Sequence, residues 1–225
     1  IFGENPYKSP TDMGVNMAGN CICDDQVCRE ASNQEIIRRY YAALKGLAEG
    51  TSQEEEAYKI ELLMKQAHTS VEDRKVVSAA LKRAEETNGP AAALELENGQ
   101  IITGKTTALL GASAALLLNA LKHLAGLSDD LHLISPTVIE PIQTLKTAYL
   151  GSSNPRLHTD EVLIALSICA ATDENAKLAL EQLPKLRGCQ AHTSVMISAV
   201  DLKLFKRLDV QLTSEAKFEN KRIYH

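Results

Sequence analysis

AAALELENGQIITGKTTALLGASAALLLNALKHLAG, residues 91–126, is the stretch that decides the fold. Two β-favouring runs flank Asn98-Gly99, a dipeptide typical of two-residue type I′ turns, and together they predict a β-hairpin. No charge occurs in residues 106–121, and a helix that is apolar on nearly all sides belongs in a core. Because Lys122 and His123 close the uncharged run, it is shorter than a membrane span of about 20 apolar residues. The stretch therefore predicts a hairpin followed by a buried helix.

The segments on either side of this unit give the rest of the expected fold. A capping box at Ser32 and Glu35 begins an amphipathic helix that ends at Gly50, and Ser9 begins a short helix within an otherwise irregular start. The other expected elements are helices at 54–67 and 71–87, strands at 91–96, 100–103 and 131–135, helices at 138–150, 161–171 and 175–183, a strand at 189–197, a helix at 201–208 and an edge strand at 210–213.

These elements predict an α/β fold, in which an N-terminal helical segment is followed by a mixed sheet with a hairpin, a central buried helix and flanking helices. We expect an irregular connector with a short helix at 1–28, a helical subdomain at 29–89, an α/β domain at 90–213 and a tail at 214–225.

Composition limits the classes of function. The net charge is −5, from 24 basic and 29 acidic residues, and no basic stripe stands out, so we expect no nucleic-acid partner. No apolar run is long enough to predict a membrane partner. Five cysteines form an odd set with no signal peptide ahead of them, which favours reduced thiols and a cytoplasmic location. The start at Ile1, without an initiator Met, is typical of a processed product or a fragment.

Three of the cysteines lie close together near the N-terminus, at Cys21, Cys23 and Cys28. Their C-x-C-x4-C pattern lacks the paired C-x2-C spacing of structural zinc sites, and no His follows nearby. We therefore expect no metal site, and the residues specify no cofactor.

Residues 99–106 match the G-x-x-x-x-G-K-[ST] phosphate loop. Such a loop turns its backbone N–H groups inward, whereas Gln-Ile-Ile-Thr is stiff, β-favouring sequence. We therefore expect a strand here and keep Lys105 and Thr106 as candidates for holding an anion at the start of the following helix. At the far end of that helix, Asn119 and His123 share a face. They are candidates for a polar pocket, or they satisfy buried carbonyls.

Residues 189–192 place a thiol near an imidazole. A Cys–His pair generates a thiolate nucleophile in many enzymes, so Cys189 and His192 are the catalytic candidates. Because strand side chains alternate, the two face opposite sides unless the chain bends at Gly188. The alternative is a buried Cys and a hydrogen-bonded His. Gln190 shares a face with His192 and is a candidate for lining a cleft.

The polar N-terminal loop is a further candidate site. Lys8 precedes a helix cap and is placed to meet an anion at the helix N-terminus, although Asp12 puts a competing negative charge there. The candidate ligand-binding residues of this loop are Lys8, Ser9, Thr11, Asp12 and Asn16. Two other interpretations remain open, an ordered connector between domains and an assembly device without chemistry.

Five motifs carry a resemblance to a known family. They are NPYKSPTDMGVN (5–16), EASNQEIIRR (30–39), DLHLISP (130–136), EVLIALSICAAT (161–172) and GCQAH (188–192). On these motifs the chain resembles the C-terminal half of the bacterial proteins grouped as domain of unknown function 1846. The resemblance implies a protein of about twice this length, whose other half carries a glycine-rich segment similar to a phosphate-binding loop. Some members carry the label ATP-dependent peptidase, and the family brings no established catalytic residues.

The leading hypothesis is that this chain supplies ligand contacts and oligomer contacts to an N-terminal, nucleotide-binding-like half of the same cytoplasmic protein. Its expected partners are that half and further copies of itself. The alternative is a hydrolase or transferase that uses Cys189 or His192 in this half.

Overall fold

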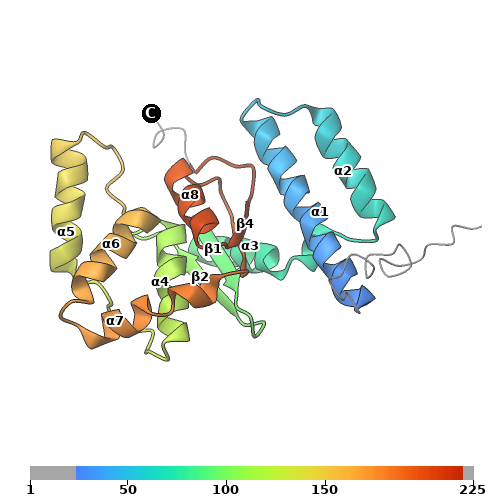
Figure 1. The fold of residues 1–225 in the computed structure, drawn as a ribbon. Coiled ribbons are helices and arrows are strands. Elements are labelled where there is room, and N and C mark those ends of the chain that lie inside the picture. The colour runs from blue at the N-terminus through green and yellow to red at the C-terminus, as the bar shows by residue number, and fades with distance from the viewer. Residues whose placement is uncertain (1–23, 220–225) are drawn as a thin grey trace, which may run out of the picture.

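The computed structural model describes residues 24–219 and shows an α/β fold around a four-stranded mixed sheet (Figure 1). The strand order is β2-β1-β3-β4, with β1 antiparallel to both of its neighbours and β3 parallel to β4. The elements in chain order are α1 (Asp25–Ala48), α2 (Glu54–Gln66), η2 (Val71–Asp73), α3 (Lys75–Thr87), β1 (Ala91–Glu95), β2 (Ile101–Lys105), α4 (Ala112–Leu124), α5 (Pro136–Thr144), η3 (Leu145–Tyr149), α6 (Thr159–Cys169), α7 (Glu174–Leu180), η4 (Leu183–Leu186), β3 (Gln190–Thr193), α8 (Ala199–Arg207) and β4 (Gln211–Ser214). The predicted fold class is confirmed.

Helices cover both faces of the sheet. Side chains alternate along a strand, and in β1 Ala92 and Leu94 join the main core with α4, whereas Ala93 packs with Val76 and Ala80 of α3. A strand covered on both faces buries every side chain, which explains the unbroken apolar run at the start of β1. The uncharged α4 accordingly lies in the core.

The backbones of β2 and α4 meet at Gly104. A Cβ placed on this glycine would lie 2.2 Å from the backbone nitrogen of Leu116 and 2.8 Å from the carbonyl oxygen of Ala112. Only a residue without a side chain permits this approach. The contact fixes where α4 crosses the sheet.

The hairpin is present, but its turn is not the predicted two-residue type I′. The Gly99 N–H donates to the Leu96 carbonyl (2.8 Å), the Leu96 N–H donates to the Gln100 carbonyl (2.9 Å), and Gly99 alone in this turn has a positive φ, of +79°. This is a three-residue loop that ends in a left-handed glycine. The Asn98 side chain accepts from the Gln100 N–H (3.0 Å) and so supports the longer loop.

Two other predicted elements were wrong. The first helix begins at Asp25 rather than after Ser32, because Asp24 caps it by accepting from the Gln26 and Val27 N–H groups. The strand predicted at 131–135 is an irregular segment in which Leu133 and Ile134 are buried, and it ends at the cap of α5. A short apolar run does not distinguish a strand from buried irregular chain. The short helix predicted at Ser9 lies outside the described residues.

A buried arginine joins the helical hairpin α1–α2 to the sheet. Arg74 is 1% exposed, and all the acceptors of its guanidinium are neutral. They are the side chains of Gln34 (3.1 Å), Thr213 (3.1 Å) and Gln190 and the carbonyls of Ala191 (3.0 Å) and Gln211 (2.6 Å). Burial lowers the pKa of Arg74 to about 10, so the group stays charged at neutral pH. It ties α1, β3 and β4 together at one point.

Figure 1 shows the α1–α2 hairpin projecting on the side of the sheet opposite α5. None of the helices within residues 24–219 combines the length and the apolar character needed to cross a bilayer.

We predict that Gly104→Ala destabilises the protein by about 2 kcal/mol or more, because α4 must shift to admit the methyl group. Urea denaturation followed by circular dichroism measures the change. Gly89→Ala is the matched control, since the nearest atom to its new Cβ would be 3.8 Å away. Equal stabilities of the two variants would contradict the close-approach explanation.

We predict that Arg74→Lys costs about 2–4 kcal/mol of unfolding free energy. An ammonium has three donors and cannot reach the separated acceptors of the guanidinium, which leaves buried carbonyls unpaired. The same denaturation experiment tests it, with the exposed Arg207→Lys as control. A loss no larger than that of the control would show that the acceptors find other donors.

Candidate functional site

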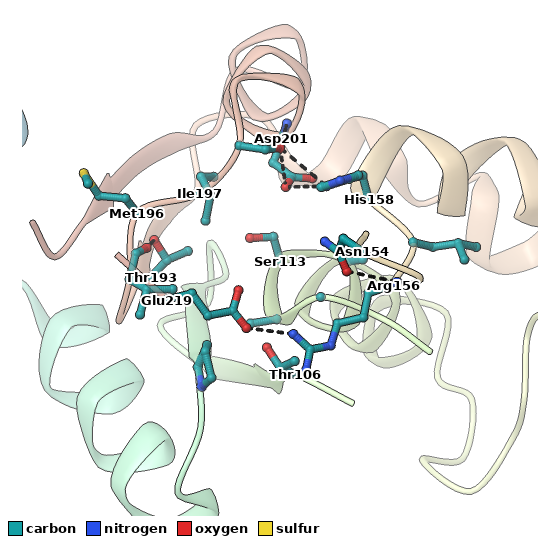
Figure 2. A pocket seen from close by; sticks show the side chains of 17 residues that line it. Thr106, Ser113, Asn154, Arg156, His158, Thr193, Met196, Ile197, Asp201 and Glu219 are labelled. Carbon is teal, nitrogen blue, oxygen red and sulfur yellow. Dashed lines mark hydrogen bonds and ion pairs between the residues drawn. The ribbon is translucent and has the colours of Figure 1, made fainter. Parts of the chain in front are cut away.

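Three helices begin around one cavity at the carboxyl ends of β2 and β3 (Figure 2). The first residues of α4, the segment before α6 and the start of α8 form its walls, and Thr106 and Thr193 contribute from the sheet edge. The cavity has a volume of about 50 Å³. Because each helix N-terminus presents free N–H groups and a partial positive charge, three of them at one place favour negative charge.

Two of these N-termini are already satisfied by the protein. Asp201 accepts from the backbone N–H (2.9 Å) and the hydroxyl (2.7 Å) of Thr159, at the start of α6. Glu161 accepts from the N–H of His158 (2.7 Å). At the start of α8, Ser198 accepts from the Asp201 N–H (3.2 Å). Both helices therefore carry a protein carboxylate or hydroxyl at their N-termini.

The N-terminus of α4 is open. Its cap residue is Gly111, which has no side chain to accept a hydrogen bond. The first turn brings Ser113 into the cavity wall, where the residue is 4% exposed and its hydroxyl has no hydrogen-bond partner within residues 24–219. Ser113 Oγ is not one of the fully shielded side-chain atoms that lack a partner, so it keeps access to the cavity, where a ligand can reach it. Figure 2 shows this hydroxyl inside the cavity.

Arg156 adds positive charge beside this open N-terminus. Its Nε donates to the carbonyl of Thr107 (3.1 Å), which fixes the side chain, and its Nη1 lies 2.8 Å from a carboxylate oxygen of Glu219. Figure 2 shows the Glu219 carboxylate reaching into the cavity between Arg156 and Ser113. An acidic group of the chain itself therefore lies where the local charges favour an anion.

A histidine–aspartate pair forms the opposite wall. His158 Nδ1 lies 3.2 Å from Asp201 Oδ2, which also accepts from the Ser198 hydroxyl (2.8 Å). This hydrogen bond raises the pKa of His158. Burial raises the pKa of Asp201, but the hydrogen bonds from His158 and Thr159 outweigh it and hold the pKa below its ordinary value. Nε2 of His158 has no hydrogen-bond partner among the described residues, so it is the nitrogen left for a ligand.

A buried lysine supports this wall from behind. Lys146, 7% exposed, donates to the Arg156 carbonyl (2.6 Å) and to Glu161 (2.7 Å). Because Glu161 also holds the His158 N–H, one ammonium fixes the segment that carries both Arg156 and His158.

The candidates chosen from sequence fall in several places. Thr106 lines this cavity, whereas Lys105 and Asn119 line a second one on the other side of the loop at 106–110. His123 lies in the last turn of α4, and neither cavity includes it. The N-terminal candidates Lys8, Ser9, Thr11, Asp12 and Asn16 lie outside the described residues.

His192 is fully buried on the sheet face that α1 covers. Its Nδ1 is 2.8 Å from the Thr213 hydroxyl, and its ring centroid is 4.9 Å from that of Tyr41. Nε2 lies 3.4 Å from Glu215 without hydrogen-bond geometry. Burial lowers the pKa of His192 despite this nearby carboxylate. Gln190 belongs to the same polar cluster through its contact with Arg74.

Cys189 is 5% exposed and packs in the main core. Its thiol lies 3.7 Å from the Lys185 carbonyl, and burial raises its pKa. A thiol nucleophile needs a lowered pKa or an adjacent base. The surroundings of Cys189 therefore favour the unreactive thiol form.

The sequence reasoning did not select Arg156, His158, Ser113 or Asp201. The only sequence pattern near Arg156 and His158 was the helix-capping pattern around Thr159. Asp201 lies about forty residues further along the chain, and no spacing rule links it to the start of α6.

Comparison with known proteins places the chain in a family. The model described as domain of unknown function DUF1846, C-terminal, matches residues 72–224, and the N-terminal model of the same family matches residues 1–68. The chain belongs to the DUF1846 family. This confirms the resemblance seen in the motifs.

Curated relatives carry the family designation UPF0371. The chain is 58% identical over 221 residues to a UPF0371 protein of Corynebacterium aurimucosum, covering 98% of this chain and 44% of that protein. It is 55% identical over 224 residues to one of Corynebacterium urealyticum and 48% identical over 224 residues to one of Streptococcus thermophilus, covering 100% of this chain and 45% of each relative. The chain thus spans about half the length of the curated relatives it matches.

The boundary between the two family models falls between α2 and α3. Helices α1 and α2 lie within the N-terminal match, and α3 and the sheet lie within the C-terminal match, which begins inside η2. The cavity residues Ser113, Arg156, His158 and Asp201 all belong to the C-terminal match.

We predict that Asp201→Asn lowers the pKa of His158 toward its ordinary value, because the amide keeps an acceptor for Thr159 but removes the negative charge. Titration of the imidazole by NMR measures this shift. The stability lost in the variant should be greatest between about pH 4 and 6.5. It should shrink above that range as His158 deprotonates, and below it as Asp201 is protonated.

The control for this titration is Asp130→Asn, an exposed acid far from the cavity in sequence. It should leave the His158 titration unchanged. A His158 pKa that stays raised in Asp201→Asn would contradict the assigned partner.

Proposed function

We propose that this chain binds the anionic group of a ligand, such as a phosphate, at the open N-terminus of α4. The observation that carries the proposal is the contrast between the three helices that meet there. The N-termini of α6 and α8 are capped by acceptors of the protein itself. The N-terminus of α4 instead offers its first N–H groups, the hydroxyl of Ser113 and the nearby Arg156. Such an arrangement is a typical anion site.

Glu219 supports this proposal as an internal competitor. Its carboxylate pairs with Arg156 within the cavity. A bound phosphate would displace this carboxylate and take over its contact with Arg156. Charge-assisted contacts of this kind are stronger than neutral ones, so removal of the competing charge should strengthen anion binding.

His158 gives the site a group that can exchange protons. Its Nδ1 faces Asp201, which orients the ring, and the hydrogen bond to Asp201 raises the pKa of His158 and so favours the imidazolium. We propose that His158 donates a hydrogen bond or a proton to the bound group. This keeps a hydrolase or transferase reaction within the proposal, with His158 rather than Cys189 as the reactive residue.

In this proposal the chain is the C-terminal region of a longer cytoplasmic protein. It supplies these contacts to an N-terminal, nucleotide-binding half, and copies of the protein associate as a homo-oligomer. The length of the relatives supports the longer protein. Apolar side chains at the end of η3, with Tyr149 77% and Leu150 70% exposed, support association through this region.

The alternative hydrolase or transferase built on Cys189 and His192 has less support. Both side chains are buried, and neither lines the cavity at α4.

Calorimetric titration with inorganic phosphate tests the proposed function. Arg156→Gln should weaken binding by tenfold or more, because it removes a charged contact. Ser113→Ala should weaken it by about three- to tenfold, and Glu219→Gln should strengthen it by removing the competing carboxylate.

Arg207→Gln, an exposed arginine at the end of α8, is the matched control and should bind like the original protein. Phosphate affinity that is the same in Arg156→Gln, Glu219→Gln and the control would refute the site. Circular dichroism of each variant separates a binding effect from unfolding.

A further inference from the structure

A second cavity lies between α4, β2 and α5 and has a volume of about 310 Å³. Ala115, Leu118, Asn119 and Lys122 of α4 form one wall, so it lies further along the same helix whose N-terminus opens into the first cavity. Its volume is in the range of pockets that enclose small molecules.

The charges that line this cavity are of one sign. Arg83, Lys105 and Lys122 line it together with His132, and no Asp or Glu does so among the described residues. None of the salt bridges within residues 24–219 involves Lys105 or Lys122. Since cations and carboxylates are mixed over most protein surfaces, an unbalanced cavity of this kind favours an anion.

Lys122 is a buried positive charge without a negative partner. The residue is 8% exposed, and its ammonium donates to the carbonyls of Asp129 (2.6 Å) and Leu131 (3.4 Å), which are neutral acceptors. A buried charge is normally paired with an opposite charge, because burial without one is unfavourable. An anion in the cavity would supply the missing countercharge.

Arg83 has a carboxylate partner, but one of its N–H donors is unsatisfied. Its Nε is buried and has no hydrogen-bond partner, while its Nη1 reaches Glu86 at 3.3 Å. An N–H group of a guanidinium that is shielded from water and unpaired is a place for an acceptor. Asn119 donates to the Thr103 carbonyl (2.9 Å), which leaves its own oxygen free to accept.

The rest of the cavity is apolar. Leucines and isoleucines from four segments line it, among them Leu109, Leu118, Leu133 and Ile139. Leu109 is 37% exposed, so part of this apolar lining is open to solvent. Positive groups beside an apolar wall match a ligand with an anionic head and an apolar body.

We propose that this cavity binds a small amphipathic anion, a carboxylate or phosphate monoester that carries an apolar body. The head lies among Arg83, Lys105 and Lys122, and the body lies against Leu109, Leu118 and Ile139. The site is separate from the anion site at the N-terminus of α4 and uses none of its residues.

Isothermal titration of the whole chain with octanoate and octyl phosphate tests both kinds of head. Octanol, which lacks the charge, and acetate, which lacks the apolar body, are the comparison ligands. At least one of the two amphipathic anions should bind ten times or more tightly than either comparison ligand. Octanol or acetate binding as tightly as both anions would overturn the proposal.

Variants then locate the site without disturbing the buried Lys122. Lys105→Met and Arg83→Met should each weaken binding of the preferred anion at least fivefold, and Leu109→Ser should weaken it about threefold through lost apolar contact. Lys203→Met, an exposed lysine on α8, is the matched control and should have no effect.

Ser113→Ala, which alters the first site, should leave octanoate and octyl phosphate binding unchanged, and this separates the two sites. Unchanged affinity in both Lys105→Met and Arg83→Met would show that the anion binds elsewhere and would refute the proposal.

Discussion

The guanidinium of Arg74 is the contact on which the rest of the structure depends. It is buried without an opposite charge, and it is held by a set of neutral oxygens that come from α1, β3 and β4. The Thr213 hydroxyl accepts a hydrogen bond from Arg74 Nε and donates one to the Ala191 carbonyl. The same hydroxyl contacts His192 Nδ1, so the His192 cluster is part of this network. Such networks specify one arrangement because any other leaves buried groups unpaired. Arg74 lies at the start of the C-terminal family match and binds Gln34 in the N-terminal match, so it joins the two parts directly.

The cavity at α4 shows how a fold with ordinary caps produces a polar site. Asp201 serves two purposes, since one oxygen satisfies the start of α6 and the other orients His158. Helix α4 lacks a capping side chain because Gly111 precedes it. Placing an uncapped helix among capped ones concentrates the free N–H groups in a single place. Lys146 then holds Arg156 and His158 at fixed positions relative to that place.

Sequence patterns predicted the fold better than they predicted the sites. Helical patterning and the Asn88-Gly89-Pro90 stop predicted α3, the uncharged run predicted the buried helix α4, and the β-favouring runs around Asn98-Gly99 predicted the hairpin. The strand expected at 210–213 lies at the sheet edge, as β4. The strand expected at 131–135 failed because burial without alternation does not specify backbone shape. Lys105 and Thr106 were singled out by a phosphate-loop pattern, and they do line cavities, although strand pairing of Lys105 rules out the loop conformation that the pattern normally signals.

His158 and Asp201 were missed for a physical reason. Their pairing depends on how α8 packs beside α6, and no local rule contains that information. Ser113 was not selected because it lies in an apolar helix, where a single serine does not by itself indicate a site. What distinguishes it is the lack of a hydrogen-bond partner within the described residues, a property of the folded state alone.

The sequence separation of the paired strands bears on the order in which the sheet folds. β1 and β2 pair across a short loop, whereas Ala92 pairs with Thr193, about a hundred residues further along the chain. Local contacts form faster than distant ones, so α3, the hairpin and α4 are expected to assemble before β3 arrives. Asp201 follows β3 in the chain, so the N-terminus of α4 is expected to form before this part of the cavity wall is in place. An anion bound at α4, as proposed, would stabilise the finished fold over folding intermediates that lack Asp201.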